Sequence, residues 1–599
     1  MPRLASLALV LALVAATVLG LGSYYEAGDD AALSWLFGGS TAGAPVASVP
    51  LYFHGWGHGL AAAYAARPEV SWFGWLQGAI LLAATLLYFD VLHALLRPHG
   101  RAAAGLGLLA AFFAVGWLEH WLWFSYVRGA LLLAGAAVAW AAQRRGLGRG
   151  GAATWLLALA GVGVAWLVRP GLAGLGVAAV LPAAVLLAGG WRRAAPLLAA
   201  VALLLAGATA GLALAQPPAA AATRTLDTYL ARILDYELLT PAAGAAPSPA
   251  AGADRLAVEA TRLWLLGDSA LTNPARYRRA YRFDAPAYWH QLPARLGQRL
   301  GLLARDYFPL LLLLLATAGA FGGQRPLAGW FWLGQAGFAG ALLLLVALLK
   351  LPPRMALPLL DFWVLNNLVF LGKAWALAAG VVAPANHAAP AATAATAATA
   401  ATAATAATAA HSAPIAPAVP GLAAWAWPAR WVRRGLAAGA VLCLGGYALK
   451  TGHRGLVLGA EQRRHAQALA ALGQFPRQRV LVLAGTQDWG KSLSPFRAYR
   501  LGAGPVLQLS GWPSHDASQG RWRFALTGTR RQPAALRRLA ARPPGAVGWL
   551  LGRPEAAWLG RYLAPGTLRP LGRFAADTTV GLYQAAAPAP RRPPARPKP

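Results

Sequence analysis

Apolar runs of roughly 20 residues recur along the chain, and polar stretches separate them. Because a helix needs about 20 apolar residues to cross the hydrocarbon core of a bilayer, this pattern predicts a polytopic α-helical membrane protein with about eleven spans. The long run 356–384 fits either one tilted helix or two short helices. The expected spans are 4–22, 73–96, 102–118, 124–142, 152–168, 171–190, 194–215, 307–323, 327–349, 356–384 and 421–449.

Arginines in the short loops predict how these spans are oriented. If the N-terminus is cytoplasmic, the basic loops all fall on the cytoplasmic side, as the positive-inside rule requires. The loops 23–72 and 216–306 and the tail from residue 450 then face outward. The basic loops contain Arg97 and Arg101, Arg144 to Arg149, Arg192-Arg193, Arg325, and Arg430 to Arg434.

Composition shifts divide the chain into units. Thr recurs every third residue between Ala-Ala pairs from Thr393 to Thr408, and this tract has no side chains that could form a core. The expected units are a membrane module (1–385), a low-complexity linker (386–418), a last transmembrane helix (419–450), an outer α/β domain (451–590) and a basic proline-rich tail (591–599).

The outer C-terminal domain is predicted from an alternation of short apolar runs and amphipathic stretches. Such alternation is typical of a small α/β domain. The expected strands are 480–484, 506–509, 522–526 and 547–551, and the expected helices are 533–541 and 555–563.

Charge does not alter the prediction of a membrane protein. Hydrophobic residues make up 58% of the chain, charged residues only 12%, and the net charge is +33. A soluble domain carries about 25% charged residues. Nucleic-acid binding is not expected, because the arginines are scattered and many lie in short loops where they orient helices. A lone cysteine, Cys443, excludes an intrachain disulfide.

The best candidate for chemistry is the adjacent acidic pair Asp29-Asp30, just past the first apolar run. Aspartate and glutamate together number only 20 in this chain, so two neighbours at a membrane exit are unusual. The alternative is a structural one, in which the pair is a polar stop after a helix or a helix N-cap.

The first outer loop resembles that of bacterial GT-C glycosyltransferases, which are polytopic enzymes that take a sugar from a polyprenyl-phosphate carrier. Their first outer loop often carries an acidic pair, then a Gly-Pro segment and a Pro-x-x-x-Trp entry to the second span. The matching residues here are Asp29, Asp30, Gly43, Pro45, Tyr64, Pro68, Trp72 and Phe73.

The resemblance implies an inverting transferase in a bacterial inner membrane, with a periplasmic C-terminal domain. Its partners would be a polyprenyl-phosphate-linked sugar donor, the lipid bilayer, and a glycan, lipid or protein acceptor. The transfer needs a base for the acceptor proton and positive charge near the departing phosphate. Asp30 or Asp29 is expected to be the base, and its neighbour would orient it or hold a divalent cation.

Further candidates would bind the substrate. Lys350 and Arg354 flank a Pro-Pro turn at an outer end of two spans and could clamp a phosphate, although cations near span ends also snorkel. His54 and His58 lie in a glycine-rich segment that is expected to be a sugar-binding loop rather than a zinc site. Asp268 is expected to cap a helix near Ala270 and could reach the active cavity.

The segment Gly485–Ser492 formally matches the spacing of a phosphate loop. Pro495 follows where a helix must begin, and the domain is expected to lie outside the cell, so nucleotide binding is disfavoured.

Two other functions stay open for the whole chain. One is a non-catalytic scaffold, which would tolerate Asp→Asn at positions 29 and 30. The other is a polymerase, ligase or flippase for lipid-linked oligosaccharide, although no paired halves typical of transporters are evident.

Overall fold

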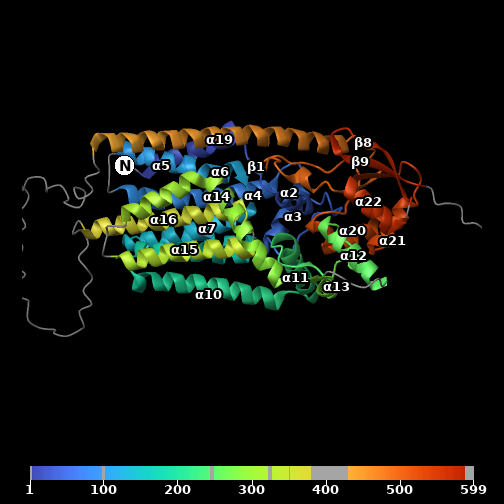
Figure 1. Cartoon of the computed structure of the whole chain (residues 1–599), viewed down its shortest axis with the longest axis horizontal. Coiled ribbons are helices and arrows are strands. Elements are labelled where there is room, and N and C mark those ends of the chain that lie inside the picture. Colours follow the sequence, from blue (N-terminus) through green and yellow to red (C-terminus); the bar gives the residue numbers. More distant parts are fainter. Residues whose placement is uncertain are drawn as a thin grey trace, which may run out of the picture.

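Long helices lie side by side along most of the molecule, and shorter helices and strands gather at one end of them (Figure 1). The computed structural model describes residues 3–97, 102–242, 249–321, 327–349, 351–378, 429–564 and 566–586. The expected linker 386–418 and the tail 591–599 lie outside the described residues.

The long helices agree with the predicted polytopic helical membrane protein. Within the described residues, eight helices are long and apolar enough to cross a bilayer, and Ala152–Val168 is a shorter apolar helix. The bundle contains α1 (Arg3–Ala16), α4 (Trp72–Leu96), α5 (Ala102–Phe112), α6 (Leu118–Leu122), α7 (Tyr126–Gly146), α8 (Ala152–Val168), α9 (Pro170–Leu187), α10 (Trp191–Ala215), α14 (Ala285–Phe321), α15 (Ala328–Leu349), α16 (Pro353–Ala378) and α19 (Ala429–Leu472).

The span count of about eleven stays a prediction. Helices α7 and α19 coincide with expected spans but are not among the eight apolar ones. The run 356–384 forms one helix as far as Ala378, and the rest of it lies outside the described residues.

Helix α14 begins well before its expected span and is kinked at Tyr307, two residues before Pro309. A proline inside a helix removes a backbone hydrogen bond, which accounts for the kink.

Helix α7 forms the buried centre of the bundle, because small residues let its neighbours approach closely. A side chain at Gly176 of α9 would collide with the carbonyl of Leu131, and one at Gly135 would collide with the ring of Phe362 in α16. Close approach at glycine and alanine is how helices gain packing energy in lipid, where apolar side chains gain nothing by leaving water.

Basic residues meet a carboxylate at the end of the bundle that holds the N-terminus. Asp90, near the end of α4, accepts from the guanidinium groups of Arg3 at 2.7 Å and Arg144 at 2.9 Å, and from the indole of Trp140 at 2.8 Å. Two segments that are predicted to be cytoplasmic, the N-terminus and the loop after α7, therefore lie at the same end of the bundle.

The predicted outer segments gather at the opposite end (Figure 1). They contain α2 (Gly28–Phe37), α3 (Trp56–Ala66), α11 (Pro218–Leu230), α12 (Pro249–Arg262), α13 (Pro274–Ala280) and the antiparallel pair β3 (Thr240–Pro241) and β4 (Tyr281–Arg282). The common location of loops 23–72 and 216–306 and the tail agrees with the predicted alternation of spans. Which side of the membrane this end faces stays a prediction.

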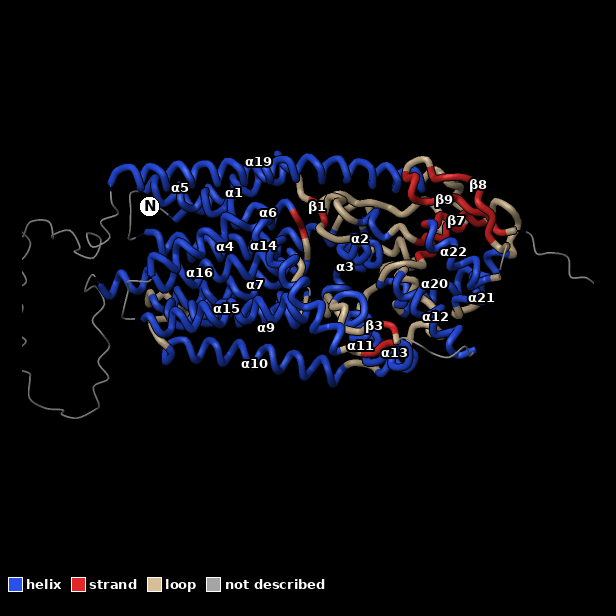
Figure 2. The backbone as a smooth tube through the Cα atoms, in the orientation of Figure 1, coloured by secondary structure: helices blue, strands red, loops and turns tan. Residues whose placement is uncertain are grey.

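Beyond α19, the described residues of the tail form a five-stranded sheet in the order β6-β5-β7-β9-β8 (Figure 2). The first three strands in this order are parallel to one another, and β9 is antiparallel to both of its neighbours, β7 and β8. The elements are β5 (Val480–Ala484), β6 (Val506–Gln508), α20 (Ala517–Thr527), α21 (Gln532–Ala540), β7 (Val547–Gly552), α22 (Arg553–Leu563), β8 (Leu568–Phe574) and β9 (Asp577–Ala585).

One predicted strand, 522–526, is wrong, because these residues lie in α20. The Asp516 side chain accepts a hydrogen bond from the amide of Ser518 at the start of this helix, and Gly528 ends it in the left-handed conformation. Such caps favour a helix over the apolar pattern of the sequence. The β8–β9 hairpin was not predicted.

Residues 486–500, which we call the docking segment, join the C-terminal sheet to the first outer loop. The amide of Ser492 donates to the carbonyl of Tyr25, and the amide of Tyr25 donates to the carbonyl of Leu493, both at 2.9 Å. The hydroxyl of Ser71 donates to the carbonyl of Pro495 at 2.6 Å. The C-terminal part of the chain therefore fixes the loop that carries Asp29 and Asp30.

Gly74, in the first turn of α4, tests this docking. A Cβ there would overlap the carbonyl of Pro495, so we expect Gly74→Ala to destabilise the protein by about 1–3 kcal/mol through overpacking. Gly174→Ala in α9 is the matched control, because no atom lies within 4 Å of its added Cβ. Thermal unfolding of the detergent-solubilised protein measures both. Equal unfolding temperatures for the two variants would contradict the docking.

Candidate active site

A two-residue parallel bridge positions the acidic pair. Strand β1 (Tyr24–Tyr25) pairs with β2 (Trp123–Phe124), and the amide of Glu26 continues the ladder by donating to the carbonyl of Phe124. Helix α2 starts immediately afterwards with Ala27 as its N-cap residue. The N-cap alternative for the acidic pair is therefore wrong. Asp29 and Asp30 lie within the first turn, where the helix dipole stabilises negative charge.

The two carboxyl groups of the pair have different environments. Asp30 is fully buried, and its Oδ1 accepts from the amide of Tyr126 at 3.0 Å. Its Oδ2 is buried and has no hydrogen-bond partner among the described residues. Burial raises the pKa of Asp30 to about 8, although the bond from Tyr126 and the charge of Arg354 oppose this rise. Near neutral pH, Asp30 therefore holds a proton and is uncharged.

Asp29 is the accessible member of the pair. Its side chain is 40% exposed, and its Oδ2 lies 3.5 Å from Nη1 of Arg354 in the first turn of α16. The contact is long and single, so the guanidinium group keeps donors for a further ligand. The structure thus brings together two predicted site residues, Asp29 and Arg354, from opposite ends of the membrane module.

Glu26 holds this arrangement in place, and the sequence interpretation missed it. Its Oε1 accepts from the amide of Arg354 at 3.1 Å. Its Oε2 accepts from Nε of Arg128 at 3.0 Å and lies 2.8 Å from Nη2 of the same group. The Arg128 side chain is fully buried, and a buried guanidinium group is tolerated only when paired. One carboxylate therefore ties the loop to α7 and α16.

A second cation lies next to the pair, between α8 and α9. Arg169 donates to the hydroxyl of Tyr126 at 3.0 Å, and its guanidinium group lies 4.9 Å from the ring centroid of Tyr52. Burial raises the pKa of the Tyr52 phenol, Arg169 lowers it, and the Asp29 carboxylate raises it again. Arg169 and Asp29 thus act on the same phenol, which places both around one polar site.

The amide of the predicted substrate-binding His54 donates to the carbonyl of Leu167 at 2.8 Å, two residues before Arg169. The ring of His54 lies 5.7 Å from that of Trp166, and burial and Arg224 lower its pKa. His58 is exposed in α3, which is a helix despite its glycines. Among the described residues, no group of three or more His, Cys, Asp or Glu is placed to hold a metal ion. Lys350 lies outside the described residues.

Asp268 has a structural function. Its Oδ1 accepts from the amide of Ala270 at 3.0 Å, and its Oδ2 accepts from the hydroxyl of Tyr562 at 2.6 Å. The predicted helix cap is wrong, because residues 269–271 form a turn and the next helix, α13, has Asn273 as its N-cap residue. Because both oxygens are occupied, Asp268 links the second outer loop to α22. Its carboxyl oxygens are therefore bonded within the protein and do not face a substrate.

Three polar residues of α16 face the protein interior. Asp361 and Asn367 are fully buried, and Asn366 is nearly so. His120 Nε2 lies 2.8 Å from Oδ2 of Asp361, and its Nδ1 lies 3.4 Å from Nη1 of Arg128. The ion pairs near the acidic pair therefore extend into the membrane part of the bundle.

The phosphate-loop-like segment has another function. After β5 it forms a 3-10 helix, Gln487–Gly490, and no helix begins at Ser492. Gly490 packs on Gly28 and Ala31 of α2, and Lys491 pairs with Glu461 at 3.5 Å. This segment is therefore part of the docking segment.

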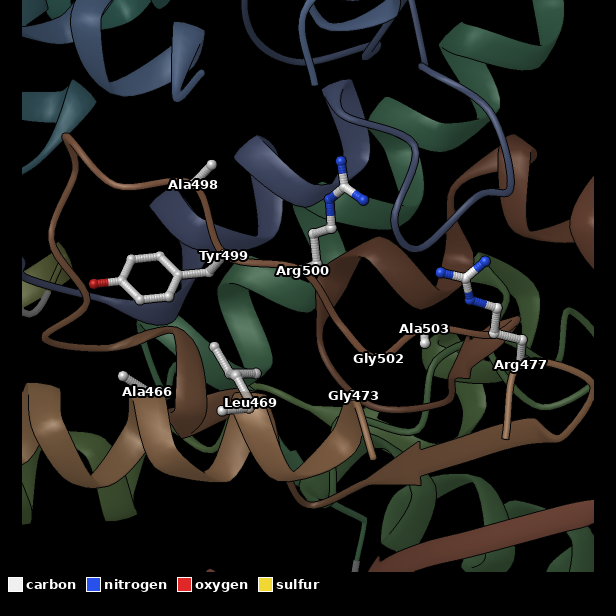
Figure 3. Close-up of a pocket in the computed structure, with 10 residues that line it drawn as sticks. Ala466, Leu469, Gly473, Arg477, Ala498, Tyr499, Arg500, Gly502 and Ala503 are labelled. Atoms are coloured by element: carbon white, nitrogen blue, oxygen red, sulfur yellow. The ribbon is translucent and has the colours of Figure 1, made fainter. Parts of the chain in front are cut away.

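Two surface hollows lie at the edge of the C-terminal sheet, and Arg477 and Arg500 line both (Figure 3). Neither hollow is lined by Asp29 or Asp30. The expected cavity beside the acidic pair stays a prediction.

Comparison of the chain with protein-family models, with curated proteins and with solved structures found no match. Its function is therefore argued from the geometry of the site.

The protonation of Asp30 predicts how stability depends on pH. The unfolded carboxyl group loses its proton near pH 4, and the folded one near pH 8. The folded state therefore binds an extra proton between these values, and stability should fall by about 1.4 kcal/mol per pH unit as the pH rises. Asp30→Asn should remove this fall, whereas Glu69→Gln, at an exposed position of the same loop, should retain it. Thermal unfolding at a series of pH values measures the slope. An unchanged slope in Asp30→Asn would contradict the assignment.

Proposed function

We propose that the chain is an inverting membrane glycosyltransferase. It transfers a sugar from a polyprenyl-phosphate donor to an acceptor on the outer face of a bacterial inner membrane. One observation carries the proposal: a partly exposed carboxylate, Asp29, lies 3.5 Å from a cation, Arg354, where a membrane helix begins. A lipid-borne phosphate reaches the protein at this depth.

Asp29 takes the role of base in this proposal. It removes the proton from an acceptor hydroxyl group, whose oxygen attacks the anomeric carbon of the donor sugar. The bond between that carbon and the phosphate oxygen breaks, and its electron pair leaves with the polyprenyl phosphate. Attack from the face opposite the leaving group inverts the anomeric centre. A positioned base of this kind contributes about 10²–10⁴ in rate.

Arg354 and Arg169 supply the positive charge. Negative charge builds up on the departing phosphate, and preorganised donors that face it lower the barrier. Arg354 lies at the first turn of α16 and Arg169 at the junction of α8 and α9, so both lie at helix ends rather than mid-membrane. A guanidinium group can bind two phosphate oxygens at once, which suits a diester.

Asp30 supports the site without being the base. Its buried, protonated carboxyl group cannot take the acceptor proton near neutral pH, and no solvent reaches it. Its bond to the amide of Tyr126 joins α2 to the start of α7. An uncharged neighbour also leaves Asp29 free of the repulsion that a second ionised carboxylate would exert.

Sugar transfer by purified full-length variants tests the proposal. Asp29→Asn should lower transfer by about 10²–10⁴ because the base is lost. Asp30→Asn should stay within about tenfold of the wild type, since an amide resembles the protonated acid in shape and charge. Glu69→Gln is the control. The assay follows release of polyprenyl phosphate from a panel of synthetic polyprenyl-phosphate hexoses and pentoses.

Two results would overturn the proposal. Full activity of Asp29→Asn would exclude Asp29 as the base. Absence of transfer by the folded wild type from every donor in the panel would favour a non-catalytic scaffold.

A further inference from the structure

A surface pocket of about 650 Å³ lies where three segments of the C-terminal region meet. The last turns of α19 form one wall through Ala466 and Leu469, and residues 498–503 form another. Arg477 closes one side (Figure 3). A pocket of this size is in the range that holds small ligands, and its open form would let a longer chain pass through.

A second hollow of about 300 Å³ adjoins the first. The two share Arg477, Arg500, Gly502 and Ala503, and the second is also lined by Gly39, Gly43 and Trp522. Residues 38–45 directly follow α2, which carries the acidic pair. The combined groove therefore runs from the C-terminal sheet toward the loop of the candidate active site.

The groove is positively charged and lacks carboxylates. Arg477 and Arg500 are both exposed, and neither makes a hydrogen bond or ion pair with any described residue. In Figure 3 the two guanidinium groups extend to the same side and incline toward each other. By contrast, the nearby Arg479 donates to the carbonyl of Gly545 at 2.6 Å and lies over the ring of Phe475. Two unpaired guanidinium groups facing one groove suit a carboxylate or phosphate ligand.

An aromatic side chain adds a rigid apolar surface to the groove. The indole nitrogen of Trp522 donates to the carbonyl of Val506 at 2.8 Å, and the ring packs against Gly43 so closely that no Cβ fits there. Gly43 also has a positive φ of 74°. The ring is therefore fixed, and a fixed aromatic ring beside a few polar groups is typical of small-ligand sites.

The groove lies beyond the outer end of the helix bundle. Arg454 of α19 pairs with Glu119 at 2.8 Å, at the outer end of the bundle. Ala466 follows twelve residues later on the same straight helix (Figure 1), which corresponds to about 18 Å at 1.5 Å per residue. A ligand from the aqueous side can therefore reach the groove.

From these observations we infer that the groove binds an acidic saccharide chain. A carboxylate or phosphate group on the saccharide bridges Arg477 and Arg500, and an adjacent sugar ring packs on Trp522. The inference rests on the proposed function only in identifying the bound saccharide as the acceptor, which the groove would guide toward Asp29.

Binding to the full-length protein in detergent tests this inference without requiring transfer. The probes are an α-1,4-linked galacturonate tetramer and the neutral maltotetraose, titrated by calorimetry. The double variant Arg477→Gln/Arg500→Gln should bind the acidic tetramer at least about tenfold more weakly, since it loses both charged hydrogen-bond donors. The control Arg553→Gln/Arg573→Gln removes the same charge from exposed positions of the same region and should bind like the wild type.

The outcomes separate this inference from the proposed function. Asp29→Asn should bind the acidic tetramer like the wild type, so lost transfer with retained binding supports the groove. Equal affinity for the neutral tetramer, or unchanged affinity of the Arg477/Arg500 double variant, would overturn it. Binding only to vesicles of anionic lipid would also overturn it.

Discussion

The buried guanidinium group of Arg128 is the constraint on which the site depends. A charge without water must be paired, and Glu26 is the carboxylate that pairs it. Because Glu26 also accepts from the amide of Arg354, the start of α16 is held against the first outer loop. Asp29 follows three residues after Glu26 and so meets the Arg354 side chain. The ion pair inside the bundle thereby fixes the distance between the proposed base and the proposed phosphate-binding cation.

The C-terminal region completes this arrangement from the other side. The docking segment adds hydrogen bonds to Tyr25 and Ser71 and covers α2 with Gly490. Asp30 beneath it is fully buried, and this burial is the reason that Asp30 keeps its proton. Two adjacent carboxyl groups thus take different forms, one neutral inside the protein and one exposed at its surface. Because their environments differ, Asp29 can act as a base while the uncharged Asp30 has a structural role.

The sequence predicted the bundle well, because apolar runs of spanning length leave few alternatives to a helix. It also predicted β5 and β7, whose residues are apolar throughout. It could not predict α20, where capping by Asp516 and Gly528 overrides an apolar run, or the pairing of Glu26 with Arg128, which are 102 residues apart. The acidic pair was identified because carboxylates are scarce in this chain. Which member faces inward was not predictable, because neighbours on a helix point about 100° apart and only the packing of α7 and α16 decides between them.

A structure of the full-length protein with a non-hydrolysable polyprenyl-phosphonate sugar would test the central claim most directly. We predict that the phosphonate contacts Arg354 and Arg169 and that the anomeric carbon faces Asp29, with Asp30 still buried against the amide of Tyr126. Binding of the phosphonate elsewhere, or a sugar directed away from Asp29, would contradict the account.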